Sequence, residues 1–311
     1  MTNAGTATIS APMARPVSQL THLMPPAAAA IGVAFLSLMD AVMKDAALMI
    51  GAYTATVLRA LFGAAIIAPF WLAQRKGWPE RRVLKLHLER GAVSAFMALT
   101  FFYSLTKLPL AEAIAISFVA PLLALYLARI LLGEEIRRQA VFASILGFAG
   151  TIVIIGGRLG RADMSMDVLL GLGSLGISAL LYAYNFVVIR RQSQVAGPVE
   201  IATFHSGVGG AILLVFAPFF GTVPDPGALL PLFAAGALTV GGAMAIAWAY
   251  ARAETQTLLP LEYSGFLWAS LFGWLFFREP VTLPTLAGTV LIVGGCWIAA
   301  RSSAAKASNQ G

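Results

Sequence analysis

The sequence predicts an all-α membrane protein of ten transmembrane helices, arranged as two inverted five-helix repeats. Three observations support this prediction. Apolar residues make up 59% of the 311 residues and charged residues only 11%, whereas about a quarter of the residues in a soluble domain are charged. The apolar residues fall into ten runs, each near the roughly 20 residues that cross the hydrocarbon core as a helix. The two halves of the chain also resemble each other.

Charge clusters and turn residues separate the apolar runs. The connections are short except for residues 74–90, QRKGWPERRVLKLHLER, where basic and apolar residues alternate. This stretch fits either a short helix on the membrane surface or a solvated loop. The expected spans are residues 26–46, 51–73, 90–107, 109–132, 138–157, 168–190, 199–220, 228–251, 256–277 and 281–300.

The distribution of basic residues predicts the orientation. Of the 21 Lys and Arg residues, 15 fall on the side of the two termini and 5 on the opposite side. Basic residues are concentrated in cytoplasmic loops, so both termini are expected in the cytoplasm, as tails over 1–25 (disordered) and 302–311. The polar N-terminal stretch lacks the apolar segment of a cleaved signal peptide.

A shift of 145 residues aligns the two halves of the chain. It places LLGEEI (131–136) on FFREPV (276–281), and therefore Glu134 on Glu279. The predicted repeats are residues 26–158 and 168–301. Because each has an odd number of helices, the second is expected to enter the membrane from the opposite face. Many secondary transporters are built from such inverted repeats, with the substrate site near mid-membrane where the halves meet.

Several function classes are disfavoured by what the sequence lacks. The single cysteine, Cys296, excludes an intrachain disulfide framework and a thiolate metal cluster. The motifs HExxH, GxxxxGKS/T and GxSxG are absent, which disfavours zinc hydrolysis, ATP use and serine hydrolysis. The net charge of +7 is explained by membrane orientation. We therefore expect no cofactor, metal or nucleic-acid partner. The expected partners are the lipid bilayer and a small-molecule substrate, and the oligomeric state does not follow from the sequence.

Two long stretches resemble the drug/metabolite transporter superfamily, specifically its EamA-type members with two five-helix repeats. They are TFFYSLTKLPLAEAIAISFVAPLLALYLARILLGE (100–134), with Pro121 and Glu134 at the family positions, and LEYSGFLWASLFGWLFFRE (261–279), with Glu279. The second copy has Phe266 at the position of Pro121, a departure from the pattern. The resemblance implies a bacterial inner-membrane secondary transporter of a small organic metabolite. Many such members export amino acids or their derivatives.

The segments LMDAVMKDA (38–46) and VLRALFGAAII (57–67) also resemble family members that take up riboflavin or S-adenosylmethionine. An integral membrane enzyme and a channel are the alternatives. Among the three histidines only His205 falls within an expected span, and no motif groups a nucleophile with a base. No repeated loop resembles a channel filter, and inverted halves suit alternating access.

Asp40 and Arg59 are expected to form an ion pair. They lie at similar distances from the predicted turn near Gly51 on antiparallel helices, which places them at similar depth in the outer half of the membrane. An unpaired acid or base at a helix centre costs roughly 2.5–3.5 kcal/mol on insertion scales, and pairing removes much of this penalty. The pair either binds helix to helix or exchanges with substrate or a proton, and the sequence leaves both open.

Asn185 and His205 are the counterparts of this pair in the second half of the chain, on its inner side. Histidine changes charge near physiological pH, so His205 is a candidate for proton coupling, with a packing histidine as the alternative. Glu262 is a further acid deep in a span, beside Tyr263, and the repeat places it opposite Ser117. The candidate aromatic wall residues include Tyr103, Tyr184 and Trp248.

Overall fold

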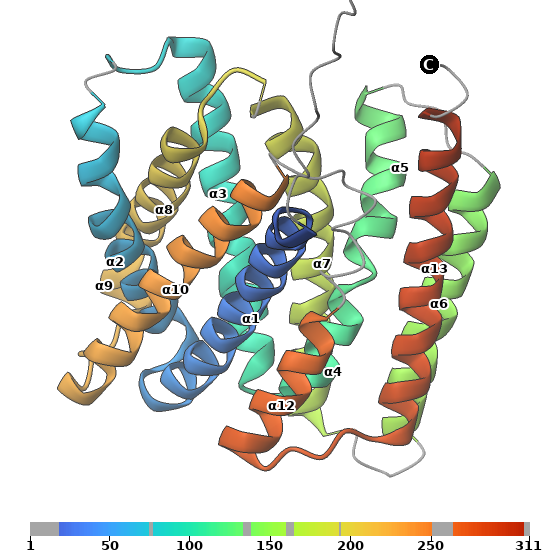
Figure 1. Ribbon diagram of the computed structural model, residues 1–311. Helices are drawn as coiled ribbons and strands as arrows, with labels where there is room; N and C mark the ends of the chain where they lie inside the picture. Colours follow the sequence, from blue (N-terminus) through green and yellow to red (C-terminus); the bar gives the residue numbers. More distant parts are fainter. Residues whose placement is uncertain are drawn as a thin grey trace, which may run out of the picture.

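The computed structural model describes residues 19–74, 77–132, 138–159, 165–192, 194–250 and 264–307, which form helices joined by short connections without any strand. Figure 1 shows the helices gathered into one bundle. They are α1 (Gln19–Ile50), α2 (Ala52–Ala73), α3 (Arg81–Leu105), α4 (Leu110–Ser117), α5 (Ala120–Leu132), α6 (Arg138–Leu159), α7 (Met166–Gln192), α8 (Pro198–Val215), α9 (Ala217–Phe220), α10 (Pro226–Tyr250), α12 (Gly265–Phe277) and α13 (Leu283–Ala307).

The helices are of the kind that crosses membranes. Within the described residues, six helical stretches are long and apolar enough to span a bilayer, and three further apolar helices are shorter. Large apolar side chains lie on the outside of the bundle: Phe219, for example, is 80% exposed and Leu283 78% exposed. In water such a surface would be unfavourable, whereas lipid tails are themselves apolar. The fold is therefore that of a multi-pass membrane protein.

The two ends of the bundle are named here by a glycine at each. At the Gly51 end lie the turn between α1 and α2, the connection from α3 to α4 and the last turn of α12 (Figure 1, bottom). At the Gly77 end lie the connection from α2 to α3 and the end of α13 (Figure 1, top). Gly51 has φ 84°, a conformation that glycine adopts without strain, so it permits the tight reversal between α1 and α2.

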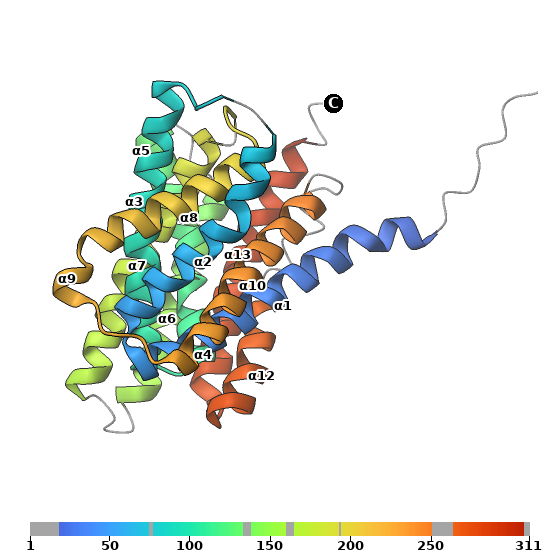
Figure 2. The same ribbon diagram turned by 90° about the vertical axis from the view of Figure 1, so that its left-hand side faces the viewer.

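Four pairs of helices make the most extensive contacts: α6 with α13, α1 with α10, α3 with α7, and α2 with α8. Figure 2 shows the same bundle from the side of α2 and α8, which face the viewer. Two of the pairs cross where glycines face each other. A Cβ atom on Gly150 of α6 or Gly288 of α13 would lie 2.5 Å from the carbonyl oxygen of the other. Gly32 and Gly242 meet similarly where α1 crosses α10. Helices in membranes approach most closely at small residues of this kind.

The structure corrects three expected helix boundaries. Residues 81–90 are neither a surface helix nor a loop but the first turns of α3. The expected helices over 109–132 and 199–220 are each interrupted, between α4 and α5 and between α8 and α9. Pro121 and Pro218 lie just after the two breaks. Each lacks the N–H that would continue the helical hydrogen bonding, so the preceding turn opens.

Candidate functional site

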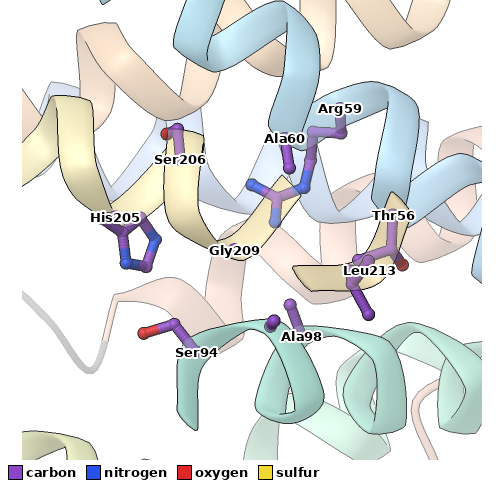
Figure 3. A pocket seen from close by; sticks show the side chains of 10 residues that line it. Thr56, Arg59, Ala60, Ser94, Ala98, His205, Ser206, Gly209 and Leu213 are labelled. Atoms are coloured by element: carbon purple, nitrogen blue, oxygen red, sulfur yellow. The ribbon is translucent and has the colours of Figure 1, made fainter. Parts of the chain in front are cut away.

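A small cavity lies between α2, α3 and α8, inside the bundle. About 20 Å³ of it is open to the centres of water molecules, which is room for about one water. Figure 3 shows Arg59 and His205 pointing into this space, with Ser94 and Ala98 on α3 forming another wall. The polar residues of the lining are Thr56, Arg59, Ser94, His205 and Ser206, and the others are Ala60, Ala95, Ala98, Gly209 and Leu213.

Arg59 is the centre of the site. From α2, its Nη1 donates a hydrogen bond of 3.3 Å to the hydroxyl of Thr239 on α10. Its guanidinium carbon lies 5.2 Å from the ring centre of Phe102 on α3, a cation–π contact. The Nε of Arg59 is buried and has no hydrogen-bond partner among the described residues. The guanidinium therefore links three helices, and its buried Nε–H group remains available as a donor.

His205 comes to the same cavity from α8. Its Nδ1 is also buried and has no partner in the described part of the chain. Across the cavity, the Ser94 hydroxyl donates to the Oδ1 of Asn185 on α7 at 3.3 Å. The expectation that Asn185 and His205 form a separate inner site is therefore wrong. His205 shares its cavity with Arg59, and Asn185 supports the wall of that cavity through Ser94.

Asp40 and Arg59 interact electrostatically, but they do not form the expected direct ion pair. The described ion pairs are Lys44–Glu279 and Lys107–Asp167. Asp40 lies on α1 and is not part of the cavity lining. Its charge acts on Arg59 across the space between the helices, so none of the described carboxylates is in contact with the guanidinium.

The other predicted residues that the structure describes are not part of the cavity lining. Ser117 is the last residue of α4, and its hydroxyl donates to the Ala113 carbonyl of its own helix at 2.9 Å. The Tyr184 hydroxyl donates to Glu89 at 2.5 Å. Tyr103 packs against the apolar core, and Trp248 lies on α10. Glu262 and Tyr263 fall outside the described residues.

A polar cluster lies at the Gly51 end, and we call Lys44, Glu279 and the backbone of Leu108 and Leu110 the Lys44 lock. Lys44 on α1 forms an ion pair with Glu279, just past α12, and donates to the Leu108 carbonyl at 2.8 Å. The Leu110 N–H donates to Glu279 Oε2 at 2.8 Å. Arg278 directs Glu279 into this position by adopting a left-handed backbone conformation with φ 56°, which is uncommon for a residue with a side chain. The lock connects segments from both halves of the chain.

A second cluster lies at the Gly77 end, and we call His87, Gln192, Arg90 and Glu200 the His87 network. The Gln192 amide donates to His87 Nδ1 at 2.5 Å. His87 then carries its proton on Nε2, which lies 2.9 Å from Glu200 Oε1 and donates to it. Arg90 Nη1 donates to Gln192 Oε1 at 3.0 Å. His87 and Gln192 are completely buried, so this network joins α3 to α7 and α8 away from water.

Neither cluster could be predicted from the sequence. Glu279 falls just after the expected span 256–277, and His87 lies outside the expected spans. The signal for Glu279 was its match to Glu134 in the repeat, and the signal for Lys44 was its place in an apolar run. His87 was missed because residues 81–90 were not assigned to a helix that packs against α7 and α8.

The fold and the site together define a class of protein: a helical membrane protein with a polar cavity lined by helices of both halves and with a polar cluster at each end of the bundle. The comparisons with known proteins agree. The pattern of the EamA-like transporter family matches residues 23–156 and again residues 169–301. The chain therefore belongs to the EamA-like transporter family, within the drug/metabolite transporter superfamily.

Named relatives are transporters. The pseudopaline exporter CntI of Pseudomonas aeruginosa strain UCBPP-PA14 is 26% identical over 265 residues, which cover 84% of this chain and 90% of the exporter. The S-adenosylmethionine uptake transporter of Rickettsia prowazekii is 22% identical over 257 residues, covering 83% and 85% of the two chains. A solved crystal structure with 21% identity superposes with a TM-score of 0.60 over 88% of this chain and 96% of its own, which supports the fold.

Proposed function

We propose that this protein is a secondary carrier that moves a small organic metabolite across the bacterial inner membrane by alternating access. The single observation that carries the proposal is the polar cavity around Arg59 and His205, lined by helices of both halves, with one polar cluster at each end of the bundle. We infer that this arrangement is the closed state through which a carrier passes between its two open states. Opening the Lys44 lock would admit solute from one side, and opening the His87 network would release it on the other.

The contacts between helices support ten crossings in two inverted repeats. In chain order α1, α2, α3 and α6 of the first half correspond to α7, α8, α10 and α13 of the second. Exchanging each helix for its counterpart maps the four main contact pairs onto themselves: α1 with α10 becomes α7 with α3, while α2 with α8 and α6 with α13 are unchanged. A two-fold relation of this kind allows one half to rock against the other.

The orientation is part of the same proposal. The basic residues place both termini in the cytoplasm, which makes the Gly51 end the outer end and the Gly77 end the inner end. The Lys44 lock then faces the periplasm and the His87 network faces the cytoplasm. Amino acids or their derivatives, riboflavin and S-adenosylmethionine are the candidate substrates, and a proton is a candidate coupling ion.

Two other functions fit less well. The cavity groups in Figure 3 include a histidine and two serines. However, the Ser94 hydroxyl donates a hydrogen bond to Asn185, and no described contact joins a hydroxyl to His205. An activated nucleophile would need such a contact. A channel would need a continuous polar path, whereas buried clusters interrupt the path on both sides of the cavity.

The test is uptake into proteoliposomes containing the purified protein. A thermal-shift screen against amino acids, riboflavin and S-adenosylmethionine first selects the compound for labelling, because a ligand of the folded state raises apparent stability. A carrier gives saturable uptake of the labelled compound, accelerated when the same unlabelled compound is inside the vesicles. Uptake that rises linearly with concentration and ignores the internal compound would contradict the proposal and indicate a channel.

A further inference from the structure

We propose that the cavity is a carboxylate subsite, in which Arg59 and His205 hold the acid group of the transported solute. The inference rests on the proposed carrier function and specifies its substrate class: organic solutes with a free carboxylate. Among the candidates this selects amino acids and S-adenosylmethionine, and it excludes riboflavin, which has no carboxylate.

Two buried hydrogen-bonding groups at the cavity are unsatisfied among the described residues. Buried polar atoms in proteins almost always have a partner. At this cavity Arg59 Nε and His205 Nδ1 have none among the described residues, and both side chains line the same space from opposite helices. A carboxylate presents two acceptor oxygens, and one guanidinium can engage both. The nitrogen of His205 adds a second donor from α8 when it carries the proton.

The described charged side chains around the cavity carry more positive than negative charge. Among the described residues, Arg59 on α2 and Arg90 on α3 both act electrostatically on His205 on α8, and Asp40 on α1 acts on Arg59. These groups comprise two guanidinium groups and a single carboxylate, even with His205 neutral. Neither arginine belongs to any ion pair in the part of the chain that the structure describes. Charges inside a membrane protein are expensive unless paired, so a guest anion would compensate the excess.

The size of the side chains that line the cavity is also consistent with a small acid group. Most of the apolar lining consists of small residues, Ala60, Ala95, Ala98 and Gly209, and Leu213 is its larger member. The cavity has room for about one water. It therefore fits at most a small head group, and the remainder of the solute needs the space that opens when either cluster separates.

The experiment compares matched pairs of compounds that differ only in the carboxylate. The full-length protein in detergent is heated with L-methionine or L-methioninamide, with L-phenylalanine or L-phenylalaninamide, and with S-adenosylmethionine or decarboxylated S-adenosylmethionine. Riboflavin and inorganic phosphate complete the set. The expected result is a rise in melting temperature with at least one carboxylate compound and a smaller or absent rise with its match.

Two variants and one control connect that effect to the site. Arg59→Gln should weaken binding of the positive compound by about 30-fold, the loss expected when one partner of a buried charged hydrogen bond is removed. Arg59→Lys keeps the charge but not the fork of N–H groups, and it should bind with intermediate affinity. Arg82→Gln changes an exposed arginine on α3 and should bind like the wild type.

Each other outcome overturns the inference. Equal stabilisation by both members of every pair, stabilisation by phosphate or riboflavin alone, and stabilisation that survives Arg59→Gln all exclude a carboxylate subsite at Arg59. No stabilisation by any carboxylate compound excludes it as well. The carrier function is judged separately, because saturable uptake of riboflavin that is unaffected by Arg59→Gln would leave a carrier without this subsite.

Discussion

The Lys44 lock should be strongly coupled, and a double-mutant cycle measures the coupling. Lys44 is 5% exposed in its side chain and Glu279 is 20% exposed. Removing one partner of a buried ion pair costs roughly 3–5 kcal/mol, because an uncompensated charge is left behind. Glu279→Ala would strand the Lys44 ammonium and also remove the acceptor of the Leu110 N–H. We expect it to lower the free energy of unfolding by about 3 kcal/mol.

Lys44→Met should cost less, about 1–2 kcal/mol, because Glu279 is partly exposed and keeps its bond to the Leu110 N–H. The double variant removes both charges together, so we expect a coupling energy of about 2 kcal/mol. The assay is unfolding of the purified protein in mixed micelles of increasing SDS content, followed by tryptophan fluorescence.

The control cycle uses Lys107→Met and Asp167→Ala, a pair 2.8 Å apart with side chains 27% and 66% exposed. Water screens such a pair, so its coupling should be much smaller than that of the lock. A coupling energy between Lys44 and Glu279 below about 0.5 kcal/mol, the level of exposed pairs, would show that the Lys44 lock is not a strongly coupled buried pair.

Three further predictions concern other parts of the molecule. Gln192→Leu should destabilise the protein by about 2–4 kcal/mol in the same unfolding assay, because His87 and Arg90 would lose buried partners, whereas exposed Gln74→Leu should change little. Gly150→Ala should cost about 1–3 kcal/mol because its Cβ would lie 2.5 Å from the Gly288 carbonyl oxygen. Gly156→Ala on the same helix meets nothing within 4 Å and should be neutral or stabilising; equal melting temperatures for the two alanine variants would contradict this packing. Ser94→Ala should weaken solute binding less than Arg59→Gln, because it removes a neutral hydrogen bond to Asn185; an equal loss in the binding assay would count against Arg59 as the main anchor.

Much of the fold could be predicted from the sequence because membrane helices carry their signal in length and composition. The run over α2 was predicted to within a residue, since Gly51 and a polar stretch enclose it. The start of α3 could not be predicted in this way. Its first ten residues are strongly charged, and they are helical because His87 and Arg90 find partners on α7 and α8, which no local pattern encodes.

The site was only partly predictable for a related reason. Asp40, Arg59 and His205 attracted attention because charged or titratable residues are rare in apolar spans. Depth along a helix could be read from the sequence, but rotation about the helix axis could not. Arg59 therefore contacts Thr239 and Phe102 rather than Asp40, and Lys44, one turn beyond Asp40, forms the ion pair instead.

Labelling the cavity from each side of the membrane shows whether two separate gates close it. Ala98→Cys, in a protein whose single cysteine is replaced by serine, places a thiol on the wall shown in Figure 3. A membrane-impermeant maleimide is then applied to oriented vesicles from one face at a time. We expect slow labelling from both faces in the otherwise unchanged protein. Glu279→Gln should accelerate labelling at least tenfold from the outer face alone, and His87→Leu should do so from the inner face alone. Acceleration from the same face, from both faces or from neither would contradict a cavity closed by two separate gates.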